Sequence, residues 1–172
     1  MQCILQQLVN LDEGDIGVVT QTFGIDDLII NQVKDFMAST NIGNIPVCQI
    51  TLVSTFDPTI IVDINKRIKK SKGECACCED PITNVAKSMI GNLVDIDFIS
   101  PTDFGTFTDE IIDVGEGIIV GRNLGDPNEI DFFSSCSITR IAPANEQIND
   151  QPRFSNFREL KRSIPPLSTK GS

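Results

Sequence analysis

The sequence predicts a mainly β protein: an antiparallel sandwich or jelly-roll-like barrel with one or two short helices and an extended C-terminal arm. Three observations lead to this fold class. Apolar residues recur with a period of two, glycine and proline separate the alternating segments, and 172 residues suit one domain. We expect residues 1–143 to form the β domain and residues 144–172 to form a polar, basic arm.

Five segments show the alternation expected of β-strands: residues 47–56, 59–69, 92–100, 110–122 and 129–141. Asp57-Pro58 predicts a hairpin or corner between the first two segments. Gly115 and Gly117 predict a bulge or tight bend, and residues 123–128 predict a loop. The core should consist mostly of the apolar residues on these strands: Val47, Ile50, Leu52, Ile60, Val62, Ile64, Val94, Ile96, Phe98, Ile112, Val120, Phe132 and Ile138.

Two segments have helical spacing instead. Residues 26–38 form an apolar stripe, preceded by Asp26 as an N-cap, that consists of Leu28, Ile29, Val33, Phe36 and Met37. Residues 83–90 predict a second, short helix between Pro81 and Gly91. The sequence alone suggests no internal repeat.

The absence of histidine excludes much of enzyme chemistry. A Ser-His-Asp or Cys-His relay needs an imidazole to carry the proton near neutral pH. The chain also lacks the glycine-rich nucleotide loops and the HExxH motif. Asp95 and Asp97 share one face of a predicted strand, and we interpret them as a solvated face rather than an acid/base pair. We therefore expect no catalytic residue and no enzymatic activity.

The charge of the chain is distributed unevenly. Residues 1–131 carry 21 acidic and 8 basic side chains, a net charge of −13, whereas residues 132–172 carry 3 acidic and 6 basic ones, a net charge of +3. A pI near 4.3 argues against nucleic acid as a partner. The chain has no apolar run of about 20 residues, so we expect no membrane-spanning helix.

Two basic stretches favour contacts between copies of the chain. A basic run, composed of Lys66, Arg67, Lys69, Lys70 and Lys72, stands just before the acidic segment 73–131. The arm carries a second basic set with apolar anchors, composed of Arg153, Phe154, Phe157, Arg158, Lys161 and Arg162. Opposite charges steer association, and buried aromatic side chains anchor it. We expect the arm to lie on a neighbouring subunit.

The six cysteines admit several interpretations. Cys48 and Cys136 lie on the apolar faces of predicted strands, which favours buried thiols or a bridge between sheets. Cys75, Cys77 and Cys78 lie within four residues, so they bond elsewhere, bind a soft metal or stay reduced. Intersubunit disulfides are expected from Cys3, Cys75, Cys77 and Cys78. The alternative is a Zn or Cu(I) site, or a redox centre, at the Cys75–Cys78 loop, although the CxCC spacing lacks the usual CxxC partner.

These observations favour a non-enzymatic structural subunit that assembles with its own copies into a filament, coat or shell. In composition the chain is similar to subunits of bacterial spore coats, spore appendages and other self-assembling shells, including capsids. The alternative function is a thiol-based metal-binding or redox module at Cys75–Cys78. The N-terminus lacks a secretory signal pattern, so we expect synthesis in the cytoplasm and later release or deposition on a cell, spore or virion surface.

Overall fold

A computed structural model describes residues 1–9, 11, 15–56, 76–101, 103–115 and 117–144 of the chain. The first elements are α1 (Gln2–Gln7), β1 (Ile16–Thr20), β2 (Gly24–Ile25), β3 (Ile30–Lys34), β4 (Met37–Thr40), β5 (Gly43–Pro46), the 3₁₀ helix η1 (Val47–Gln49) and β6 (Ile50–Thr55). The later elements are α2 (Ala76–Lys87), β7 (Leu93–Ser100), β8 (Asp103–Gly115), β9 (Ile118–Asn123), β10 (Ile130–Ser134), the 3₁₀ helix η2 (Ser135–Ser137) and β11 (Ile138–Pro143).

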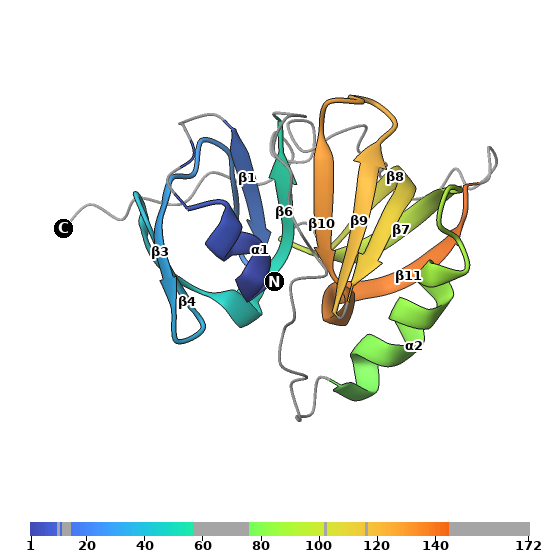
Figure 1. The fold of residues 1–172 in the computed structure, drawn as a ribbon, viewed down its shortest axis with the longest axis horizontal. Coiled ribbons are helices and arrows are strands. Elements are labelled where there is room, and N and C mark those ends of the chain that lie inside the picture. The colour runs from blue at the N-terminus through green and yellow to red at the C-terminus, as the bar shows by residue number, and fades with distance from the viewer. Residues whose placement is uncertain (10, 12–14, 57–75, 102, 116, 145–172) are drawn as a thin grey trace.

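The strands form two sheets, and every pair of neighbouring strands is antiparallel. The larger sheet has the order β11-β7-β8-β9-β10-β6-β1-β2, and the smaller has the order β3-β4-β5. Figure 1 shows β3 and β4 beside α1 at one end of the molecule and α2 beside β11 at the other. The predicted fold class, a mainly β antiparallel sandwich with short helices, is confirmed.

Two apolar cores lie on opposite faces of the central strands. The first core joins α1 and the small sheet to β1, β6, β9 and β10, and the second joins α2 to the other face of the large sheet. Adjacent residues therefore enter different cores: Phe132 the first and Phe133 the second, Val53 the first and Leu52 the second. Strand β6 is buried along its whole length. A strand buried on both faces needs no polar face, so the predicted one-sided alternation of residues 47–56 is incomplete.

Most predicted core positions that can be compared are buried. The nine buried ones are Val47, Ile50, Leu52, Val94, Ile96, Phe98, Val120, Phe132 and Ile138. Ile112 is partly buried against the first core. Ile60, Val62 and Ile64, with the whole predicted strand 59–69 and the Asp57-Pro58 corner, lie outside the described residues. The predicted bend at Gly117 is confirmed as the turn between β8 and β9, where this glycine has a φ of 73°.

The predicted helix over residues 26–38 is wrong. This segment forms β3 and the start of β4, joined by a tight turn in which Asp35 and Phe36 have φ values of 52° and 59°. A register shift lies between Ile30 and Gln32, so Ile30 and Val33 are both buried although three positions separate them. A bulged strand thus produced the spacing that resembles a helical stripe.

The helix predicted over residues 83–90 is present with different bounds. It extends from Ala76 to Lys87 and contains Pro81, whereas the sequence predicts a helix that begins after this proline. Ala86 packs in the second core, and Gly91 has a φ of 82° beyond the helix end. Helix α1 was not predicted. It buries Ile4 and Leu5 in the first core, and tertiary burial stabilises a helix of six residues that is too short to persist alone.

The two halves of the chain repeat one order of elements. The first half (residues 2–55) runs helix, strands, 3₁₀ helix and final strand, and so does the second half (residues 76–143). In each half the strand after the 3₁₀ helix pairs with the strand after the α-helix: β6 with β1 and β11 with β7. The elements η1–β6 and η2–β11 have equal lengths and lie 88 positions apart. The order of elements is thus repeated, although the first half has six strands and the second five and β3-β4-β5 form a separate sheet, and the sequence-based expectation included no repeat.

Candidate functional site

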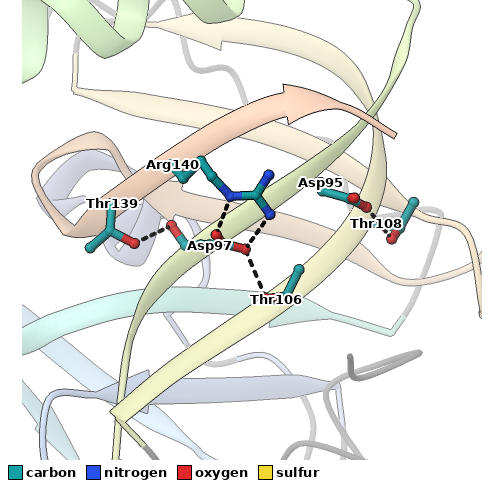
Figure 2. Close-up of polar contacts among 6 residues, drawn as sticks. All are labelled: Asp95, Asp97, Thr106, Thr108, Thr139 and Arg140. Atoms are coloured by element: carbon teal, nitrogen blue, oxygen red, sulfur yellow. Dashed lines mark hydrogen bonds and ion pairs between the residues drawn. The ribbon is translucent and has the colours of Figure 1, made fainter. Parts of the chain in front are cut away.

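A polar cluster lies on β7, β8 and β11, on the face opposite Val94, Ile96 and Phe98. The carboxylate of Asp97 accepts hydrogen bonds from Arg140 Nη2 at 3.2 Å and Thr106 Oγ1 at 2.8 Å, and a further one from Arg140 Nε (Figure 2). Thr139 Oγ1 donates to the backbone carbonyl of Asp97 at 3.2 Å, and Thr108 Oγ1 donates to Asp95 at 2.8 Å.

The prediction that Asp95 and Asp97 form a solvated face is wrong. Both residues are buried, with exposed fractions of 0% and 5%. Their alternation with the apolar residues of β7 was predicted correctly, but the other face of the strand is also covered. A buried carboxylate needs compensating donors, which Arg140 and the threonines supply. Hydrogen bonding to Asp97 raises the pKa of Arg140 above its ordinary value, so the guanidinium keeps its charge.

Replacing Arg140 with methionine should destabilise the protein by about 2 kcal/mol, because Asp97 then keeps its burial and loses two charge-assisted hydrogen bonds. The matched control is Arg122→Met. Arg122 pairs with Glu110 at 3.1 Å on strands β9 and β8, but both side chains are more than 40% exposed, and we expect its loss to cost less than about 1 kcal/mol. Urea unfolding followed by circular dichroism measures both. Equal costs would contradict a structural role for the Asp97–Arg140 pair.

A second polar cluster crosses strands β6, β10, β9 and β8. Asp131 on β10 accepts hydrogen bonds from Ser54 Oγ on β6 and from Asn123 Nδ2 on β9, the latter at 3.3 Å. Asp109 on β8 reaches the same place because Gly121, the partner of Asp131 on β9, has no side chain. A Cβ at Gly121 would lie 2.1 Å from Oδ2 of Asp109. The two carboxyl groups therefore meet above a glycine.

Burial controls the ionisation of this pair. Desolvation, with repulsion from Glu129, raises the pKa of Asp109 from 3.8 to about 8. Desolvation and repulsion from Asp109 also raise the pKa of Asp131. Neither carboxyl oxygen of Asp109 has a hydrogen-bond partner at normal distance and angle among the described residues. Ionised carboxylates only accept hydrogen bonds, so Asp109 and Asp131 can share one only when one of them holds a proton.

A cavity of about 340 Å³ lies at a different place, beside β5. Its apolar lining comes from Phe23, Ile25, Ile42, Ile45 and Pro46, and its polar lining includes Asn44. Asp109 and Asp131 do not line this cavity and are fully buried, so a ligand in the cavity does not touch the carboxyl pair.

Four described strands end the hydrogen-bonded order of the sheets: β2 and β11 in the larger sheet, and β3 and β5 in the smaller one. Among the described strands, β5 pairs only with β4, and β11 pairs only with β7. Three of the four residues of β5 are exposed, as is Ile42 just before it. Unpaired strand edges are templates for strand addition. The cavity, β5 and its edge form one continuous surface, which we call the β5 edge.

The predicted cysteine and arm sites are only partly described. Cys75 and the whole arm, including Arg153, Phe154, Phe157, Arg158, Lys161 and Arg162, lie outside the described residues. Cys77 and Cys78 belong to the backbone of α2, and nothing is described of their side chains. Cys3 is half-buried and forms no disulfide. Within the described part of the chain there is no cluster of three or more ligating side chains that suits a metal ion.

The expectation that Cys48 and Cys136 are buried on strand faces is wrong. Both cysteines are exposed, and each is the middle residue of a 3₁₀ helix, η1 or η2. Neither takes part in a disulfide. The 3₁₀ turn interrupts the alternation of the preceding strand, so a period-two pattern carried through it assigns the cysteine to the wrong face.

Sequence reasoning missed the Asp109–Asp131 pair and the repeat. A weak signal existed for each. Asp131 directly precedes the buried pair Phe132-Phe133, and the pattern Cys-x-Ile-Thr occurs both at Cys48–Thr51 and at Cys136–Thr139. The meeting of Asp109 with Asp131, 22 positions apart, depends on strand register and could not be read from the sequence.

In the described helices, no segment is long and apolar enough to cross a membrane. A scan against protein-family models and searches of curated proteins and solved structures find no match to this chain.

Proposed function

We propose that the protein is a non-enzymatic structural subunit that assembles with copies of itself into a filament, coat or shell. The observation that carries the proposal is the pair of strand edges, β5 and β11, next to exposed surface. Neither strand presents a free charge at its edge: β5 carries no charged residue, and the charge of Arg140 on β11 is bound to Asp97. Each strand ends in a proline, Pro46 or Pro143.

The position of the buried carboxyl groups also supports a non-enzymatic role. Perturbed carboxyl groups are candidates for acid/base catalysis when they line a cleft. Asp109 and Asp131 are fully buried between strands, whereas the described cavity lies beside β5. Their raised pKa values thus fit a structural pair that joins β6, β10, β9 and β8 better than a catalytic one.

The proposed assembly includes contributions from the arm and from cysteines. The basic arm, with Phe154 and Phe157 as anchors, adds contacts to the acidic body of a neighbour, and intersubunit disulfides from Cys3, Cys75, Cys77 or Cys78 make the assembly resistant to salt. Such disulfides require an oxidising compartment, such as the surface of a cell, spore or virion.

Sedimentation velocity of the purified protein at a series of concentrations measures the mass of the species formed. Negative-stain imaging of the same samples, with and without reductant, shows their shape and their dependence on disulfides. We expect species much larger than the 18.8 kDa chain. Deleting residues 145–172 should weaken assembly while the β domain stays folded. Replacing Cys75, Cys77 and Cys78 with serine should leave assembly intact but sensitive to salt.

A chain that stays monomeric at high concentration would contradict the proposal. If that monomer also binds stoichiometric Zn or Cu(I), removed by chelators and lost on replacement of Cys75, Cys77 and Cys78, the thiol module is the correct function instead. If the chain without residues 145–172 assembles as tightly as the full chain, the arm has no part in assembly.

A further inference from the structure

We infer that copies of this chain join head to tail, with the β11 edge of one copy added to the β5 edge of the next. The inference rests on the proposed function and specifies its junction. The chain already contains one such junction between its own halves, because β6, the last strand of the first half, pairs antiparallel with β10 of the second half.

The internal junction has a defined register. Ile130, Asp131, Phe132 and Phe133 on β10 pair with Thr55, Ser54, Val53 and Leu52 on β6. Strand β10 immediately precedes η2, just as β5 immediately precedes η1. Strand β11 immediately follows η2, just as β6 immediately follows η1. In the repeat, β5 is therefore the equivalent of β10, and β11 is the equivalent of β6.

Burial supports this equivalence residue by residue. Ile45 packs in the first core and its equivalent Phe133 in the second, 88 positions later. Likewise, Ile50 packs in the first core, and Ile138, 88 positions later, packs in the second. Each half thus has one strand that precedes the 3₁₀ helix (β5 or β10) and one that follows it (β6 or β11). The internal junction pairs β10 with β6, which leaves β5 and β11 as the unpaired edges of these two kinds; β2 and β3 also end sheets but have no counterpart in the internal junction.

Transferring the internal register to these edges predicts the junction between copies. Ile42, Gly43, Asn44 and Ile45 of one copy should pair with Pro143, Ala142, Ile141 and Arg140 of the next. Pro143 lies at one end of this ladder, and Pro46 follows the other end, positions at which proline is tolerated. The four residue pairs equal the number in the internal junction.

The cavity beside β5 fits the same arrangement. At the internal junction, Val19 on β1 pairs with Leu52 on β6. Both side chains pack in the second core. Their equivalents on β7 and β11 are Asp97 and Arg140, which also pair with each other. The first core receives Ile118, Val120 and Phe132 from the second half, and the cavity lies beside β5, on the edge that no described strand covers. In the transferred register Arg140 stands opposite Ile45, which also lines the cavity, so the next copy would present its Asp97–Arg140 pair (Figure 2) on that side of the strand.

Head-to-tail pairing is heterologous, so each copy offers one edge of each kind, and repetition produces a closed ring or an open filament. This property permits a test with edge-blocked variants. Asn44→Lys blocks β5 and leaves β11 intact, whereas Ile141→Lys blocks β11 and leaves β5 intact. Asn44 is exposed and Ile141 is half-buried. Circular dichroism therefore checks that each variant is folded, and Ala142→Lys replaces Ile141→Lys if the latter is not.

Sedimentation velocity of each variant alone, and of an equimolar mixture, gives the readout. Each variant alone should stay monomeric, with an apparent dissociation constant raised about tenfold or more over the wild type. The mixture should form 1:1 heterodimers and nothing larger, because each dimer uses the one unblocked β5 edge and the one unblocked β11 edge. In a single chain, Asn44→Glu with Ile141→Lys should restore assembly, because opposite charges then face each other across the ladder. Asn44→Glu with Ala142→Lys, in which the two charges lie on opposite faces of the ladder, should not.

Three outcomes would overturn the inference while leaving the proposed function in place. Either variant alone could form dimers, which means that like edges pair. Both variants could assemble as the wild type does, which means that the junction lies elsewhere. The in-register and out-of-register charge pairs could restore assembly equally, which means that the register is wrong. A wild-type chain that stays monomeric at every concentration would instead contradict the proposed function itself.

Discussion

Replacing Asp109 with asparagine should make the protein more stable at pH 8 and flatten the dependence of its stability on pH. Burial raises the pKa of Asp109 from 3.8 to about 8 in the folded protein. In the unfolded chain the carboxyl group regains its ordinary pKa and ionises near pH 4. Between these two values the folded state holds a proton that the unfolded state has released, so the folded state binds more protons.

The sign follows from this difference in bound protons. The free energy of unfolding should fall as pH rises from about 4 to about 8, by about 1.4 kcal/mol per pH unit for each proton held. The stabilising contribution is complete below the unfolded pKa and is lost as pH passes through the folded pKa. Asparagine has the same shape and no ionisable proton, so at pH 8 Asp109→Asn should gain on the order of a few kcal/mol.

Urea unfolding at several pH values, followed by far-ultraviolet circular dichroism, measures this dependence; the chain has no tryptophan or tyrosine for fluorescence. Asp131→Asn should act in the same direction, because the pKa of Asp131 is also raised and the two groups titrate together. Glu110→Gln is the matched control, because Glu110 lies on the same strand and is partly exposed. This substitution should leave the dependence of the unfolding free energy on pH unchanged. A wild-type slope equal to that of Asp109→Asn would show that Asp109 does not hold a proton in the folded state.

Replacing Gly121 with alanine should destabilise the protein by roughly 1–3 kcal/mol through overpacking. The added Cβ would lie 2.1 Å from Oδ2 and 2.8 Å from Cβ of Asp109, so rotation of the Asp109 carboxyl group alone does not remove the clash. The neighbouring carboxyl of Asp131 limits where the Asp109 side chain can go. Urea unfolding at pH 5, below the raised pKa of Asp109, measures the cost while this carboxyl group is protonated in the folded state.

A double-mutant cycle with Asp109→Gly separates this clash from other effects of alanine in the strand. Removing the Asp109 side chain removes the clashing atoms, so the double variant should be more stable than the sum of the two single losses predicts. Gly91→Ala is a useful comparison: Gly91 has nothing within 4 Å of an added Cβ, but its φ of 82° makes the substitution strained. Additive losses at positions 121 and 109 would contradict the steric contact.

The strand pattern of the second half could be predicted because it depends on local chemistry. Val94, Ile96 and Phe98 alternate with Asp95 and Asp97, and alternation alone places the two sets on opposite faces of a strand. Gly117 identifies a turn because glycine readily adopts a positive φ. These features require no knowledge of which strands are neighbours, so the sequence determined the antiparallel β class and most of the predicted core.

The tertiary structure decided what each face meets. Asp95 and Asp97 have the pattern of a solvated face, yet they are buried with Arg140, a residue more than 40 positions away. The spacing of Leu28, Val33 and Met37 indicated a helix, but a bulge and a tight turn at Asp35-Phe36 produce the same spacing in strands. A short apolar segment suits either structure, and only its packing partners select one.

By itself, then, the sequence determined the fold class, the absence of histidine chemistry and the unequal charge of body and arm. Only the tertiary structure decided the Asp109–Asp131 pair, the repeat of the two halves and the pairing of β6 with β10. The physical reason is that composition and periodicity are properties of neighbouring residues, whereas these features depend on strand register. Register is determined by the sum of contacts between distant segments, and a shift by one residue would move Asp131 to the opposite face of its strand.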